Sequence, residues 1–128
     1  MAVFRRLWIA AVLLLTAYII YASLASHPPV PDEMLPDKAG HYLAYLSLAL
    51  LGSGIASPER LWRTMLRCFL LGGALEIAQL LFTEHRMAEW RDLGANVAGI
   101  LTAWLIAGQG RAGWGLRAMA WFNRNRAF

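Results

Sequence analysis

The chain has 128 residues, of which 59% are hydrophobic and 16% are charged, and its formal net charge is +4. Its mean hydropathy of +0.45 lies well beyond that of an ordinary soluble domain. The basic residues flank apolar runs, which favours orientation in a membrane over binding to nucleic acid. Cys68 is the only cysteine, so an intrachain disulfide is excluded.

Four apolar runs predict a single all-α domain over residues 1–128, built as a four-helix transmembrane bundle. About 20 apolar residues cross the hydrocarbon core, and the predicted spans cover about 7–25, 39–56, 67–83 and 93–108. A cleaved signal peptide is the alternative for the first run, although its apolar part is long for one. After the last span, the residues from Trp114 to Phe122 predict a short amphipathic helix at the membrane interface, with a disordered tail as the alternative.

The distribution of basic residues predicts the orientation of this bundle, because cytoplasmic segments carry an excess of lysine and arginine. With both termini in the cytoplasm, only Lys38, Arg86 and Arg91 lie outside. The cytoplasmic side then holds Arg5, Arg6, Arg60, Arg63, Arg67, Arg111, Arg117, Arg124 and Arg126. We therefore expect an N-in, C-in topology.

Polar side chains gather at the end of the bundle that this topology places outside. Asp37 and His41 are four residues apart and therefore share a face of the second helix. The same spacing joins Asp92 to Asn96 on the fourth helix. Because unsatisfied polar groups are costly in hydrocarbon, we expect these faces and the third helix to converge on an outward-opening pocket. The predicted ligand-binding residues are Asp37, Lys38, His41, Tyr45, Glu76, Gln79, Arg86, Asp92 and Asn96.

Within this set, Glu76, His41 and Asp92 are the candidate catalytic residues, because such groups can exchange protons or act as a general base. Glu76 could instead only hydrogen-bond a neighbouring helix, which contributes about 0.6–2 kcal/mol. Asp37 is also a candidate N-cap of the second helix. A metal held by His41, Glu76 and Asp92 is disfavoured because no HExxH or CxxC spacing is present, so neither a metal nor a cofactor is predicted.

Three motifs in chain order resemble those of VanZ-like membrane proteins, and the resemblance covers roughly residues 36–108. They are Asp37-Lys38-x-x-His41-x-x-x-Tyr45, Glu76-x-x-Gln79-x-x-Phe82 with Arg86, and Asp92-x-x-x-Asn96-x-x-Gly99. The resemblance implies a small bacterial multi-pass protein of the inner membrane. The family takes its name from a member linked to teicoplanin resistance, so the resemblance also implies a role in the cell envelope.

Three classes of function fit these residues. We favour a protein that binds a lipid-linked or otherwise amphiphilic envelope ligand, with Lys38 and Arg86 contacting its phosphate or carboxylate. The first alternative is an intramembrane enzyme that acts on lipid headgroups or envelope glycans, with Glu76 and His41 as acid and base. The second is a small proton-coupled transporter with Glu76 as the carrier. The expected partners are membrane lipids, the amphiphilic ligand and further copies of the chain in a homo-oligomer, without nucleic acid.

Overall fold

A computed structural model describes residues 1–25, 36–84 and 89–126 of the chain. Its elements are α1 (Ala2–Leu24), α2 (Asp37–Ser53), the 3-10 turn η1 (Pro58–Arg60), α3 (Leu61–Phe82), α4 (Trp90–Gly108) and α5 (Trp114–Asn125). Within these three ranges every regular element is a helix and none is a strand. The prediction of an all-α protein is therefore confirmed.

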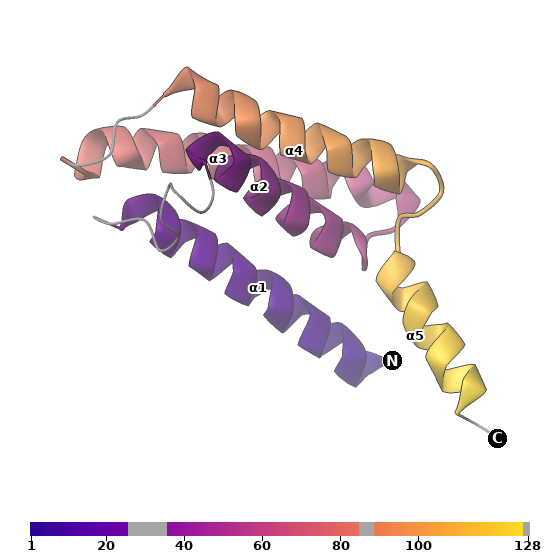
Figure 1. The fold of residues 1–128 in the computed structure, drawn as a ribbon. Helices are drawn as coiled ribbons and strands as arrows, with labels where there is room; N and C mark the ends of the chain where they lie inside the picture. Colours follow the sequence, from indigo (N-terminus) through magenta and orange to yellow (C-terminus); the bar gives the residue numbers. More distant parts are fainter. Residues whose placement is uncertain (26–35, 85–88, 127–128) are drawn as a thin grey trace.

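The first four α-helices run in alternating directions, and α5 leaves the group on the side where the N-terminus lies (Figure 1). One end of the group is consequently formed by the last turns of α1 and α3 together with the first turns of α2 and α4. We call this the polar end, because the acidic and amide side chains of the three motifs lie there. The opposite end contains the turn from α2 to α3 and the start of α5.

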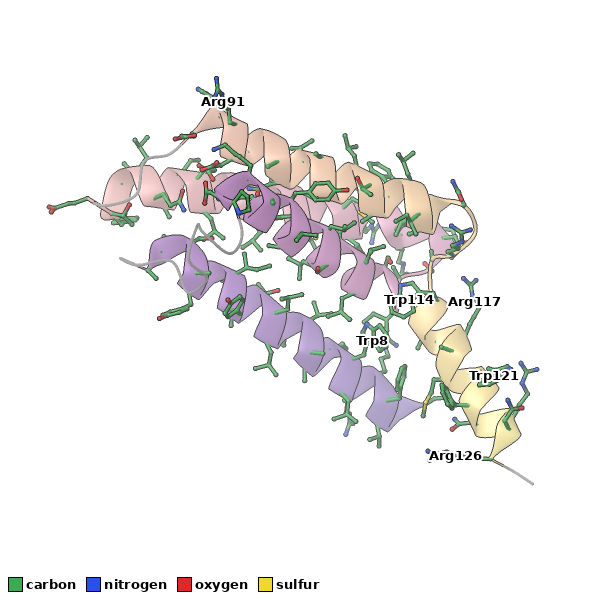
Figure 2. The ribbon with its side chains drawn as sticks, in the orientation of Figure 1. Trp8, Arg91, Trp114, Arg117, Trp121 and Arg126 are labelled. Carbon is green, nitrogen blue, oxygen red and sulfur yellow. The ribbon has the colours of Figure 1, made fainter. Side chains whose placement is uncertain are left out.

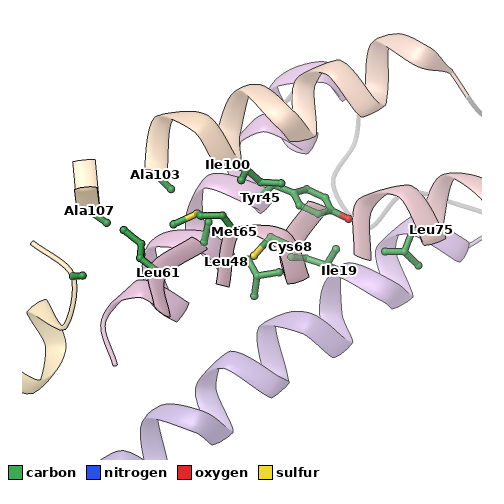
Figure 3. Packing of buried hydrophobic residues seen from close by; sticks show 12 residues of the cluster. Ile19, Tyr45, Leu48, Leu61, Met65, Cys68, Leu75, Ile100, Ala103 and Ala107 are labelled. Atoms are coloured by element: carbon green, nitrogen blue, oxygen red, sulfur yellow. The ribbon is translucent and has the colours of Figure 1, made fainter. Parts of the chain in front are cut away.

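The apolar core lies between α2, α3 and α4, and Ile19 is its one fully buried member from α1 (Figure 3). Ala49 of α2 and Ala103 of α4 are both completely buried. Gly99 permits an even closer approach, since a Cβ atom there would lie 2.9 Å from the backbone nitrogen of Leu46 and closer still to the carbonyl oxygen of Tyr42. Small residues at such crossings let two helix backbones pack directly. This contact places the first turn of α4 beside the first turn of α2.

Two segments of the structure are long and apolar enough to cross a membrane: Ala2–Leu24, with 23 residues, and Pro58–Phe82, with 25 residues. The first has little contact with the rest of the chain, and Ile19 is its only buried residue. Its exposed apolar side chains include Leu7, Leu13 and Leu14. The two segments match the first and third predicted spans, which supports a membrane-associated protein.

The start of α2 differs from the sequence prediction, which made Asp37 the N-cap. Pro36 holds the N-cap position, and no side chain caps the helix there. Asp37 is instead the first helical residue, one position further into the helix. The fixed φ of proline suits the entry into a helix, and a carboxylate in the first turn is favoured by the helix dipole. The Asp37 side chain is thereby directed toward neighbours on its own helix instead of toward backbone amides.

The C-terminal segment forms the predicted helix, so a disordered tail is excluded for residues 114–125. Its start is fixed to the end of α2: the amide of Gly113 donates to the carbonyl oxygen of Ser53 at 2.8 Å. The Trp114 indole Nε1 donates to the carbonyl oxygen of Leu50 at 3.0 Å. The rings of Trp114 and Trp8 meet edge to face, with centroids 5.1 Å apart (Figure 2). These contacts tie α1, α2 and α5 together at the end opposite the polar end.

Candidate functional site

A lysine bridge joins α2 to α4 at the polar end. The Lys38 ammonium pairs with Oδ1 of Asp92, and its Nζ lies 2.8 Å from Oε2 of Glu89. It also lies 3.8 Å from Oδ2 of Asp37. The ammonium donates hydrogen bonds to the carboxylates of both Asp92 and Glu89. Lys38 precedes the apolar run of α2, and through these bonds it links the two helices.

The imidazole of His41 lies beside this bridge, one helical turn beyond Asp37. Its Nδ1 is 2.9 Å from Oδ1 of Asn96, whose side chain is buried with 2% of the residue exposed. Its Nε2 is 3.6 Å from Oδ1 of Asp37 and 3.7 Å from Oδ2 of Asp92. Asn96 therefore fixes the orientation of the ring through Nδ1, and the other ring nitrogen, Nε2, is directed toward two carboxylates.

Glu76 brings α3 to the same end of the bundle. Its side chain is half-buried, and Oε2 accepts a long hydrogen bond of 3.4 Å from the backbone amide of Glu89. Glu89 occupies the N-cap position of α4, so this contact joins the last part of α3 to the entry into α4. A purely packing role for Glu76 predicts Gln79, Asn96 or Tyr45 as its partner, and among the described residues its hydrogen bond instead comes from the Glu89 amide.

Two residues of the predicted set lie apart from this arrangement. Gln79 is buried and its Nε2 donates to the carbonyl oxygen of Ser23 in α1 at 2.7 Å, so it faces α1. Its Oε1 is buried without a hydrogen-bond partner in the described part of the chain. Tyr45 is 2% exposed and lies in the core, where a Cβ on Gly72 would come within 3.3 Å of its ring. Neither side chain takes part in the ion pairs of the polar end.

Arg86 lies outside the described residues. It is the one member of the predicted set for which this is so. Arg91, the neighbouring arginine on α4, is exposed and points away from the other helices (Figure 2). We define the acid–histidine cluster as the residues joined by the contacts above: Asp37, Lys38, His41, Glu89, Asp92 and Asn96.

Two residues that shape this cluster are not among the predicted ligand-binding residues. Glu89 is one of them, although an acidic residue just before a helix is favoured by the helix dipole and is a signal that the sequence carries. Gly72 was not assigned to the site either. A Cβ at Gly72 would lie 3.3 Å from Nδ2 of Asn96, so glycine here lets α3 close over the amide that holds His41.

No family model, no curated protein and no solved structure matches this chain. The fold and the site together define a helical protein with two segments able to cross a membrane and a charged cluster at one end. The resemblance to VanZ-like proteins remains a prediction that is carried by the three motifs.

Proposed function

We propose that the chain is a multi-pass membrane protein of the bacterial envelope that binds the headgroup of an amphiphilic molecule at its polar end. The observation that carries the proposal is the acid–histidine cluster. Residues from α2 and from the start of α4, 51 to 55 positions apart in sequence, contact one another there. A headgroup bound at this cluster would leave its acyl chains beside the apolar outer surfaces of the helices.

The dimensions of the helices support a membrane bundle. At 1.5 Å per residue, the 17 residues of α2 and the 19 residues of α4 extend over about 26 Å and 29 Å. These lengths approach the hydrocarbon thickness of about 30 Å. Exposed apolar side chains such as Leu80 and Leu81 of α3 and Leu105 of α4 would then face lipid. We propose that α2 and α4 cross the membrane alongside the two longer segments.

The chemistry of the cluster indicates which headgroup it suits. Lys38 is held by Asp92 and Glu89, so its charge is already balanced within the protein. The remaining atoms are mainly carboxylate oxygens, which accept hydrogen bonds. A headgroup that carries amine, hydroxyl or amide donors, such as a lipid-linked glycan or peptide, therefore fits better than a bare phosphate. Lys38 accordingly takes the role of holding α2 to α4 in place of its expected contact with the ligand.

Mass spectrometry of the purified protein tests this proposal. We expect the wild-type chain to keep one class of amphiphile through detergent washing, and His41→Gln to lose most of it. Glu59→Gln is the matched control, because Glu59 is an exposed acid in η1 at the opposite end. Equal retention by all three proteins, or retention of bulk membrane lipid alone, would contradict the proposal. The VanZ-like resemblance extends it to glycopeptide resistance, which a shift in teicoplanin susceptibility on expression in a sensitive host would test.

The arrangement around His41 favours one second candidate, an enzyme that acts on the bound headgroup. A ring nitrogen fixed by Asn96 and a carboxylate of Asp92 on the other side of the ring resemble the way a general base is oriented. Glu76 is joined to the same end of the bundle through its hydrogen bond from the amide of Glu89. Turnover of a retained amphiphile by the wild type, but not by His41→Gln, would show that the protein is an enzyme.

The proposed topology leads to a labelling prediction. In a Cys68→Ser background we expect a cysteine at Glu84, an exposed position just after α3, to react with an impermeant thiol reagent in intact cells. A cysteine at Gln109, exposed just after α4, should react only after the membrane is opened, because α4 would carry it to the other side. Labelling of both positions in intact cells, or of neither, would defeat a bundle in which α4 crosses the membrane.

A further inference from the structure

The oxygens of two aspartates in the acid–histidine cluster are divided between two neighbours. Asp92 directs Oδ1 to the Lys38 ammonium and Oδ2 to Nε2 of His41. Asp37 directs Oδ2 toward Lys38 and Oδ1 toward the same His41 nitrogen. One oxygen from each carboxylate, on two different helices, therefore faces Nε2 while Lys38 holds the other oxygen.

The two contacts to Nε2 are too long to be hydrogen bonds. The N···O separations are 3.6 and 3.7 Å, whereas hydrogen bonds between nitrogen and oxygen have separations of about 2.7–3.2 Å. Nδ1 lies 2.9 Å from Oδ1 of Asn96, an acceptor that fixes the ring proton on Nδ1 in the neutral imidazole. The lone pair of Nε2 is then directed at two carboxylate oxygens, with no hydrogen-bond partner for Nε2 in the described ranges.

We propose that His41, Asp37 and Asp92 bind a divalent metal ion of the zinc type. One ligand atom from each residue lies within 4.8 Å of the others. Ligand atoms of a tetrahedral zinc site lie about 3.4 Å apart when each bond is about 2.1 Å long. The two separations between Nε2 and the carboxylate oxygens, 3.6 and 3.7 Å, are already close to that value, and the two carboxylate oxygens, which lie within 4.8 Å of each other, would move together around the ion. A cation at this point would receive the Nε2 lone pair and one oxygen of each aspartate.

The charge of the surroundings matches a divalent ion. Three carboxylates, those of Asp37, Glu89 and Asp92, surround the single ammonium of Lys38. Their sum is a net charge of −2, which one divalent cation neutralises. Asp92, the most buried of the three, has only 7% of its side chain exposed, so its carboxylate needs a local partner more than a solvent-exposed acid does.

Asn96 supplies the second feature of a built metal site. A metal-binding histidine usually directs its other ring nitrogen to a carbonyl or carboxylate oxygen, which fixes its tautomer and orientation. The side-chain oxygen of Asn96 is such a partner for Nδ1 of His41. Asn96 is buried on α4, where its amide packs against Gly72 of α3. No metal is predicted from the sequence, and the ligand set disfavoured there contains Glu76 in place of Asp37.

Three protein ligands leave a fourth position open, as in catalytic zinc sites. Water or a donor atom of a headgroup could bind there, but the metal site does not depend on the proposed amphiphile. Binding of the ion can be measured on the purified protein without lipid. If the ion fails to bind, the proposal that the protein retains an amphiphile still stands. If no amphiphile is retained, the proposed metal site still stands.

Calorimetric titration of the full-length, chelator-treated protein with Zn²⁺ in detergent tests the inference. We expect one ion per chain, with His41→Gln and Asp37→Asn each weakening binding at least about 10-fold. Asp37 is chosen because its side chain is 48% exposed, so its neutral variant should fold even if a change at Asp92 does not. Zn²⁺ should also raise the melting temperature of the wild type, since a ligand stabilises the folded state that binds it, and it should not raise that of His41→Gln.

Two variants serve as controls for this titration. Glu59→Gln removes an exposed acid from the other end and should bind Zn²⁺ as the wild type does. A double variant with His27→Gln and His85→Gln removes the two other histidines of the chain and should also bind normally. The inference is overturned if the wild type shows no stoichiometric binding, if both cluster variants bind as tightly as the wild type, or if the double variant loses binding.

Discussion

Replacing Gly99 with alanine is expected to lower the melting temperature of the protein, whereas the same change at Gly94, on the same helix, is expected to raise it. A Cβ at Gly99 would collide with the backbone of α2 at Tyr42 and Leu46. Backbone atoms cannot rotate away as a side chain can, so the two helices must separate. Overpacking of this kind costs about 1–3 kcal/mol, more than the roughly 1 kcal/mol that alanine gains over glycine in a helix.

Gly94 supplies the matched control, because a Cβ there would meet no atom within 4 Å. Only the gain in helix propensity remains, which stabilises α4 by up to about 1 kcal/mol. Thermal unfolding of the two variants in the same detergent provides the comparison. A melting temperature for Gly99→Ala at or above that of Gly94→Ala would show that α2 and α4 do not pack as closely as the structure has them.

The buried face of α4 could be predicted from the sequence because it depends on the helical period alone. Asp92, Asn96, Gly99 and Ala103 recur at intervals of four, three and four residues, and all four are buried in the structure. The all-helical class likewise follows from apolar runs that are interrupted by prolines and charges. Such features belong to one element at a time, and a single element carries enough information to fix them.

The partner of each polar side chain could not be predicted in the same way. Glu76 and Gln79 are three residues apart and were both assigned to one pocket. In the structure Gln79 donates to Ser23 of α1, and Glu76 accepts from the amide of Glu89. An interval of three residues rotates the helix by about 300°, and a helix packed between two neighbours can present those two positions to different partners. Only the packing of α3 decides which neighbour each one meets.

The cluster at the polar end shows the same limit. The four-residue spacing of Asp37 and His41 predicts that they are neighbours, and the structure places them 3.6 Å apart. The spacing carries no information about Asp92, which reaches the same imidazole from a helix 51 residues further along the chain. That contact depends on the close crossing of α2 and α4 at Gly99, which is a property of the pair of helices and not of either sequence segment.

Replacing Glu76 with glutamine is expected to abolish retention of the amphiphile while leaving the melting temperature unchanged. Glutamine keeps the length of the side chain and an oxygen that can accept the hydrogen bond from the Glu89 amide. It removes the negative charge and the ability to exchange a proton. Because Glu76 contacts Glu89, a member of the acid–histidine cluster, loss of its charge changes the field at the proposed binding site without removing a packed atom.

Two further variants separate the charge of Glu76 from its shape. Glu76→Leu should lose retention and also lower the free energy of unfolding by about 1 kcal/mol, because the Glu89 amide loses its acceptor. Arg63→Gln should change neither, since Arg63 is exposed on another face of α3, with its guanidinium 5.4 Å from the centre of the Trp62 ring. Full retention by Glu76→Gln would assign Glu76 to helix packing alone. If Glu76→Gln also kept any turnover or proton transport of the wild type, Glu76 would be neither an acid–base group nor a proton carrier, because each of these roles requires a group at this position that gains and loses a proton.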